Sequence, residues 1–226
     1  MRKPFLPLSL ILSLVLFFGI GACLAIQSVV KENFIKRKVD KGSITKELME
    51  GDIIFQSTMS RQCEAVKIAT KSNYSHVGIL FKRAGEWMVY EAVQPVKFTK
   101  LSEWITHGKN NHFVVKRLEN RDSFITDSIA KVMKQEGVKY LNKDYDIYFG
   151  WSDESMYCSE LVWKIYKDAV GVEVGKLQKL KDFDLSEGIV KNIVEERYGK
   201  NTPWEETVVS PAAIFASSNL ETIVNK

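Results

Sequence analysis

Cys158 lies at the predicted start of a helix, in the sequence MYCSELVW over residues 156–163. The N-terminus of a helix carries partial positive charge and free backbone N–H groups, which favour a thiolate and can bind the oxyanion of a tetrahedral intermediate. The same residue also belongs to an apolar stripe with Leu161, Val162 and Ile165, where a cysteine is usually part of the core. Position alone therefore leaves a nucleophile and a structural thiol both open.

A cysteine nucleophile needs a base, most often a histidine, and a third group that orients the base. Of the three histidines, His107 and His112 border a polar stretch that we expect at the surface. His76 differs because it stands in a predicted apolar strand, where the alternative is a core histidine with a hydrogen-bond partner. We therefore consider His76 the candidate base.

The hairpin that follows His76 supplies a candidate third group. If residues 82–85 form a four-residue loop, Phe81 pairs with Glu86. His76 then lies directly opposite Glu91, on the same face of the sheet. Glu91 stands in an otherwise apolar strand, where a buried carboxylate needs a partner. The prediction depends on loop length, because a register slip of one residue would move Glu91 to the other face.

Motifs for other chemistries are absent from the sequence. There is no CxxC pair and no HExxH, so we predict no metal site. There is no Gly-x-Ser-x-Gly elbow and no phosphate-binding glycine loop, so a serine hydrolase of that kind and a P-loop enzyme are excluded. We expect no cofactor.

The elements that position these residues follow from the patterning of the chain. Strands are predicted at 53–55, 75–81, 86–93 and 113–118, and helices at 60–70, 101–107, 126–137 and 157–170, with a last helix starting at Ser210-Pro211. We expect the helix at 126–137 to end on its glycine, a common residue after a helix C-terminus. Strands gather in the first half and helices in the second, which predicts an α+β fold.

The N-terminus has the pattern of an export signal. Residues 1–3 are Met-Arg-Lys, and residues 5–26 carry no charge. The run Ile20-Gly21-Ala22-Cys23 resembles a bacterial lipobox, which implies cleavage before Cys23 and acylation of its thiol. Ordinary cleavage near Ala25 and an uncleaved anchor are the alternatives, since a run of this length can span a bilayer. All three place the chain outside the cytoplasm, in the periplasm or cell envelope.

Composition fits one domain behind this leader. We expect a signal peptide over 1–22, a charged tether over 23–46 and a hydrolase domain over 47–226. The chain of 226 residues is 45% hydrophobic and 27% charged, which excludes disorder. Its net charge of +4 falls to +2 without the leader, because Arg2 and Lys3 are removed with no acidic residue. A charge this small does not indicate a nucleic-acid partner, and the oligomeric state is not specified.

Four short motifs, in this order, resemble a known family. They are GDIIF at 51–55, YSHVGI at 74–79, YEA at 90–92 and YCSELV at 157–162. Together they resemble the circularly permuted papain-like cysteine hydrolases of the NlpC-type superfamily, in its YiiX-like branch. Permutation explains why the histidine and the acid precede the cysteine, because ordinary papain-like enzymes place the cysteine first.

The resemblance implies a fold, an activity and a triad. The fold would be a papain-like core, with a small antiparallel sheet packed on the cysteine helix. Cys158 would be the nucleophile that forms a thioester, His76 the base and later the acid, and Glu91 the group that orients His76. Many relatives act on cell-wall peptides, and others on lipid-linked acyl groups. Alternatives are therefore an acyl or lipid hydrolase or transferase, or a non-catalytic envelope-binding lipoprotein.

Three further residues are weaker candidates for substrate binding. Tyr157 and Ser75 are sequence neighbours of the proposed catalytic pair and could line the cleft. Asp146 could meet a cationic group of the substrate, although aspartates more often serve caps and turns. The aromatic residues around Asp146 could approach an acyl group or simply form core or lid, and we expect Cys63 to be structural. A membrane, reached through the lipid anchor or the leader, is the other expected partner.

Overall fold

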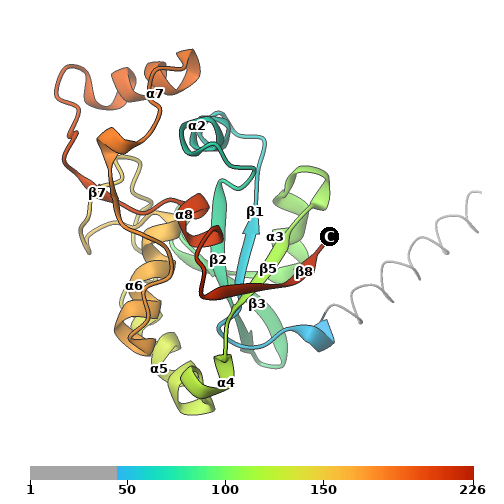
Figure 1. Ribbon diagram of the computed structural model, residues 1–226. Coiled ribbons are helices and arrows are strands. Elements are labelled where there is room, and N and C mark those ends of the chain that lie inside the picture. The colour runs from blue at the N-terminus through green and yellow to red at the C-terminus, as the bar shows by residue number, and fades with distance from the viewer. Residues whose placement is uncertain (1–44) are drawn as a thin grey trace, which may run out of the picture. The chain divides into compact units, whose positions relative to one another are not determined.

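A computed structural model of the protein describes residues 45–226 (Figure 1). The predicted signal peptide, the predicted lipidation site at Cys23 and nearly all of the predicted tether lie outside the described residues. Within residues 45–226, no helix is both long and apolar enough to cross a membrane.

Six antiparallel strands of the described residues form the central sheet, in the order β4-β3-β2-β1-β5-β8. They are β1 Ile53–Gln56, β2 His76–Arg83, β3 Glu86–Glu91, β4 Lys97–Lys100, β5 Val114–Leu118 and β8 Leu220–Asn225. The middle strands β1 and β2 consist mainly of buried apolar residues. The α+β prediction is confirmed, and the two edge strands β4 and β8 are additions to it.

Along the chain, helices alternate with the strands and dominate the second half. The helices are α2 Arg61–Thr70, α3 Leu101–His107, α4 Arg121–Phe124, α5 Asp127–Val138, α6 Cys158–Val170, α7 Gly188–Tyr198 and α8 Pro211–Phe215. The described residues also contain two short 3-10 helices and a second, two-stranded sheet. The 3-10 helices are Lys109–Asn111 and Leu180–Asp182, and the sheet pairs β6 Gln178–Lys179 with β7 Thr207–Val208. Side-chain oxygens of Ser60, Thr126 and Ser210 cap α2, α5 and α8, as such residues do at helix N-termini.

The main hydrophobic core lies between α6 and one face of the sheet. Leu161, Val162 and Ile165 of α6 are fully buried in the same cluster as Phe55 and Val77. Burying a large aliphatic side chain is worth about 1.5–3 kcal/mol, so this contact holds the start of α6 firmly against the strands. The apolar stripe that left the role of Cys158 open is therefore real, and the thiol lies at its N-terminal end.

The prediction that Gly137 ends its helix was wrong, because α5 continues to Val138. Gly137 instead lets the helix approach β3 closely. A Cβ at this position would lie 2.8 Å from Cε1 of Tyr90, and the Tyr90 hydroxyl donates a hydrogen bond to the Gly137 carbonyl. Gly171, by contrast, does end α6 in the left-handed conformation, with φ of 77°.

Candidate active site

Cys158 is the first residue of α6, and it is only 4% exposed. The preceding residue, Tyr157, is the N-cap, and its hydroxyl accepts a hydrogen bond from the Val209 backbone. Ser159 is tied to the same segment, because its hydroxyl donates to the Val209 carbonyl. The helix N-terminus at Cys158 is thus anchored on both sides, and its partial positive charge lies next to the thiol.

The β2–β3 hairpin has a shorter turn than predicted, because β2 continues to Arg83, so the prediction of a four-residue loop over 82–85 was wrong. Arg83 pairs with Glu86, and Ala84 and Gly85 form a two-residue turn with φ of 50° and 81°. Two positive φ values are typical of the type I′ turns that suit the twist of a hairpin. The register therefore differs from the prediction by two residues, not one, and each side chain keeps its predicted face.

His76 and Glu91 consequently meet as diagonal neighbours on one face. Nε2 of His76 lies 2.6 Å from Oε2 of Glu91, and both side chains are buried. Glu91 also accepts hydrogen bonds from the Thr99 hydroxyl and from Nε1 of Trp104, the latter at 2.7 Å. The Trp104 ring stacks beside the imidazole, with 6.0 Å between ring centroids.

The charges of this pair follow from its surroundings. Burial is the largest influence on Glu91 and raises its pKa, but hydrogen bonds and charge attraction from His76, helped by Thr99 and Trp104, lower the pKa below its usual value. Burial also lowers the pKa of His76. Hydrogen bonding and attraction from Cys158 and Glu91 outweigh that effect and raise the His76 pKa well above its ordinary value.

Cys158, His76 and Glu91 are therefore brought together from α6, β2 and β3. Because Nε2 of His76 is bonded to Glu91, Nδ1 is the ring nitrogen left for the Cys158 thiol. An imidazole between a thiol and a carboxylate can take a proton from sulfur, and later return it to a leaving group.

A largely apolar cavity of about 110 Å³ opens beside Cys158. Ala65 and Val66 of α2 and Val190 and Ile193 of α7 contribute to its walls. The structure places two of the weaker candidates, Tyr157 and Ser75, in the lining of the same cavity. A small apolar group can therefore be bound next to the thiol.

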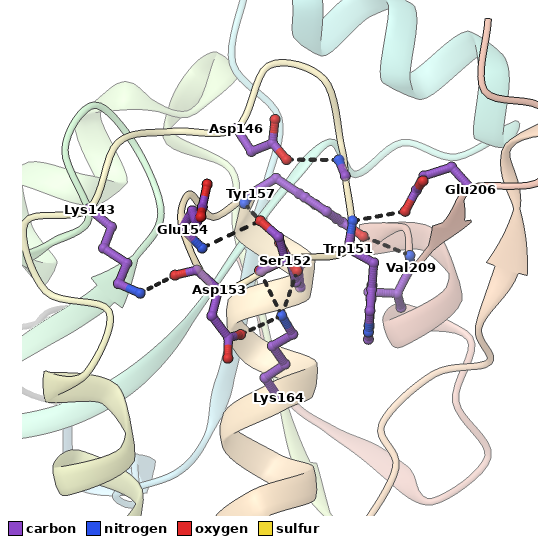
Figure 2. Close-up of polar contacts among 12 residues, drawn as sticks. Lys143, Asp146, Trp151, Ser152, Asp153, Glu154, Tyr157, Lys164, Glu206 and Val209 are labelled. Carbon is purple, nitrogen blue, oxygen red and sulfur yellow. Dashed lines mark hydrogen bonds and ion pairs between the residues drawn. The ribbon is translucent and has the colours of Figure 1, made fainter.

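Asp146 is placed differently from Tyr157 and Ser75. Its carboxylate oxygens accept hydrogen bonds from the backbone N–H groups of Tyr148 and Gly150, each at 2.7 Å, and it is not among the residues that line the cavity. Figure 2 shows Asp146 with such a contact inside its own loop. These contacts give Asp146 the turn-stabilising geometry that is common for aspartate.

Lys164 of α6 fastens the loop that precedes Cys158 (Figure 2). Its Nζ donates to the Ser152 carbonyl and to Oδ1 of Asp153, both at 2.8 Å. The same nitrogen lies 2.8 Å from Oε1 of Glu160. This contact has ion-pair distance, but its angles are not those of a hydrogen bond. Burial is the main influence on Glu160 and raises its pKa to about 7.

Sequence reasoning missed several residues around the triad. Trp104 contacts Glu91 from a helix whose bounds were predicted but whose role was not. Tyr145, considered only as one of several aromatics, lines the cavity together with Cys158, and its neighbour in the cavity wall, Gln62, donates to its hydroxyl. Cys63 is a second thiol near the site. Burial raises its pKa, but hydrogen bonds from Ser60, Ser75 and Thr58 and the charge of His76 lower it overall.

Comparison with known proteins decides the family. Residues 47–224 match a profile described as "Permuted papain-like amidase enzyme, YaeF/YiiX, C92 family". The chain belongs to this family. Members of the permuted papain-like amidases are cysteine hydrolases, and this chain is therefore an enzyme of the cysteine peptidase or amidase type.

Two relatives of this permuted amidase extend the comparison. It is 47% identical over 176 residues to the uncharacterized protein YiiX of Escherichia coli strain K12, covering 78% of this chain and 86% of YiiX. It is also similar to a crystal structure of YiiX from Escherichia coli O157:H7, with 47% identity and a TM-score of 0.76, over 80% of this chain and 98% of that one. The permuted papain-like fold is confirmed.

The description of that crystal structure calls YiiX a metalloprotein. Within residues 45–226, no three His, Cys, Asp or Glu side chains lie together in a way that could hold a metal ion. The described residues do not fit a metal site.

Proposed function

We propose that this permuted amidase is an exported enzyme that cleaves an amide bond through a thioester on Cys158, with His76 and Glu91 as the other members of a triad. One observation carries the proposal, namely that the buried His76–Glu91 pair, 2.6 Å apart, lies beside the thiol at the start of α6. Glu91 orients the ring and stabilises the imidazolium.

The reaction runs in two halves. Nδ1 of His76 takes the thiol proton, and the Cys158 sulfur attacks the amide carbonyl. The backbone N–H of Cys158 supports the oxyanion at the helix N-terminus. The tetrahedral intermediate then collapses to a thioester, while His76 protonates the leaving amine. Water, deprotonated by His76, hydrolyses the thioester and restores the thiol.

Cell-wall peptides are the first substrate class in this proposal. The export pattern of the leader supports it, since an exported enzyme would meet such peptides in the envelope or periplasm, where Cys23 would be its lipid anchor. The substrate would then be a peptide amide reached from the membrane surface.

The cavity favours a second candidate, an acyl amide or acyl ester. Its walls beside Cys158 are largely apolar, and burial of apolar surface is what binds an acyl group. A cavity of about 150 Å³ can hold a molecule the size of benzene, so about 110 Å³ suits a short apolar group rather than a long chain.

Mass spectrometry of the Cys158 peptide separates these candidates. The full chain is incubated with defined muropeptides, and separately with N-acyl amides and acyl esters, and the thioester on Cys158 is quantified. A muropeptide thioester supports the first class, and an acyl thioester the second.

The triad itself is tested with iodoacetamide, which should alkylate Cys158 faster in the wild type than in His76→Ala. Equal rates in the two proteins would contradict the triad.

A further inference from the structure

Three polar side chains from separate elements form a chain of hydrogen bonds at the cavity. Nη2 of Arg197 in α7 donates to Oε1 of Gln62 in α2 at 2.7 Å. Nε2 of Gln62 in turn donates to the Tyr145 hydroxyl at 2.9 Å. All three residues line the cavity that contains Cys158.

The hydrogen bonds from Arg197 through Gln62 to Tyr145 can run in only one donor-to-acceptor direction. A guanidinium is a donor and cannot accept, so Gln62 must turn its carbonyl oxygen towards Arg197 and its amide nitrogen towards Tyr145. The Tyr145 oxygen is then an acceptor in that bond. Its own proton is left for a different partner, and successive bonds in such a chain polarise one another.

The backbone holds Tyr145 close to the nucleophile. The Asp146 backbone N–H donates to the Met156 carbonyl and the Met156 N–H donates to the Asp144 carbonyl, both at 3.0 Å, so two backbone bonds flank Tyr145 and tie it to the segment that leads into α6. Burial, followed by the negative charges of Cys158 and Cys63, raises the pKa of Tyr145 well above its usual value. The phenol therefore stays protonated and can act as a donor.

We propose that Gln62 is a positioning residue which, held by Arg197, directs the Tyr145 hydroxyl proton towards the oxyanion formed at Cys158. The inference rests on the proposed thioester chemistry. It assigns α2 and α7 a part in catalysis beyond the walls of the cavity, because the two helices set the direction of a donor carried by the loop before α6.

Gln62→Glu tests the direction of these hydrogen bonds with almost no change in the shape of the side chain. The introduced carboxylate can only accept, so it takes the Tyr145 proton while still pairing with Arg197. The probe is p-nitrophenyl butyrate, with acylation followed by p-nitrophenolate release and by mass of the Cys158 peptide. We expect acylation to slow about tenfold to a hundredfold, since losing one oxyanion donor costs up to about 10²–10³. Tyr145→Phe should lose a similar factor, and the double variant should lose no more than either.

Gln62→Met is a second variant, which keeps side-chain length and adds no charge. It should also slow acylation, though less than Gln62→Glu. In Gln62→Met the Tyr145 hydroxyl can rotate freely and still reach the oxyanion, whereas in Gln62→Glu it donates to the introduced carboxylate. Gln135→Glu, on the exposed surface of α5, is the matched control for the charge and should react like the wild type.

Iodoacetamide gives the readout that a purely structural role would not separate. Alkylation passes through no oxyanion, so its limiting rate at high pH should be the same in the wild type and all Gln62 variants. Equal losses in alkylation and acylation, unchanged acylation in Gln62→Glu, or additive losses with Tyr145→Phe would each overturn the inference. Absence of wild-type acylation at Cys158 would instead overturn the proposed function, and the inference with it.

Discussion

His76 and Glu91 meet diagonally across the β2–β3 hairpin, with Nε2 of the imidazole 2.6 Å from Oε2 of the carboxylate. A diagonal contact uses the length of both side chains, and His76 is the first residue of β2. The carboxylate is charged in this setting, because its pKa is lowered despite burial. The pair is therefore an ion pair whenever His76 is protonated.

Glu91→Gln should move the alkaline limb of the pH–rate profile to lower pH. The raised pKa of His76 keeps the imidazolium present above pH 6.5, and activity falls when it loses the proton needed by the leaving group. Without the carboxylate charge, His76 loses that proton earlier, by about one pH unit or more, because a nearby opposite charge is worth ~1–3 pKa units. The profile of acylation by butyryl p-nitroanilide, whose amine leaving group needs that proton, measures the shift, and an unmoved limb would contradict the pairing.

Trp104→Phe separates the hydrogen bond that holds the Glu91 carboxylate in place from the charge of that carboxylate. The variant keeps a ring beside His76 but removes the indole N–H that donates to Glu91 at 2.7 Å. A hydrogen bond to a charged group is worth about 1.5–3 kcal/mol, so the free energy of unfolding should fall by that order in urea titrations. Glu91 keeps its charge, so the alkaline limb should not move to lower pH. Trp87→Phe, whose ring contacts Lys82, is the control, and a downward shift of the limb in Trp104→Phe would count against this account.

Local patterns in the sequence predicted most of what holds the triad. The bounds of α3 were predicted as observed, and α2, α6 and α8 begin at or next to the predicted residue, because caps and apolar periodicity are properties of neighbouring residues. The face shared by His76 and Glu91 was also predicted, since a register error of two preserves the alternation of side chains.

The features that were predicted wrongly or missed depend on interactions that the pattern of neighbouring residues does not reveal. Ala84 adopts a positive φ that usually belongs to Gly or Asn, so the two-residue turn was not signalled. Strand β4 has the sequence KFTK and is buried at only one position, so its apolar content is too low for a periodic signal. The contacts of Trp104 with Glu91 and of Gln62 with Tyr145 join separate elements, and depend on tertiary packing.

Glu160→Gln should make stability less dependent on pH. The pKa of Glu160 is raised by burial to about 7, so the folded state keeps it neutral between pH 4.5 and 7 while the unfolded state ionises. Its contribution to stability is therefore fully present below pH 4.5, falls as pH rises and is lost above pH 7. At about 1.4 kcal/mol per pKa unit, the variant should gain roughly 2–3 kcal/mol over the wild type between pH 5 and pH 8.

Urea unfolding at the two pH values measures this difference. Glu154→Gln, at an exposed residue of the loop before α6, is the matched control for the loss of one carboxylate, and its stability difference from the wild type should be the same at both pH values. A constant difference between Glu160→Gln and the wild type at pH 5 and pH 8 would mean that Glu160 titrates normally in the folded protein.

Gly78→Ala should weaken both the fold and the site. A Cβ at this position would lie 2.5 Å from Cγ1 of Val89 and 2.8 Å from the Tyr90 carbonyl oxygen, so β2 and β3 must move apart where Glu91 reaches His76. Overpacking of this kind costs about 1–3 kcal/mol. We expect a loss of that order in the free energy of unfolding, and slower acylation of Cys158 under conditions where the variant is still folded.

Gly188→Ala provides the matched control for this substitution. Its added Cβ would meet nothing within 4 Å at the start of α7, and alanine has the higher helix propensity, so stability should be unchanged or slightly increased. Acylation by p-nitrophenyl butyrate should match the wild type. If Gly78→Ala unfolds at the wild-type urea concentration and acylates at the wild-type rate, the close approach of the two strands at Gly78 is not what holds Glu91 against His76.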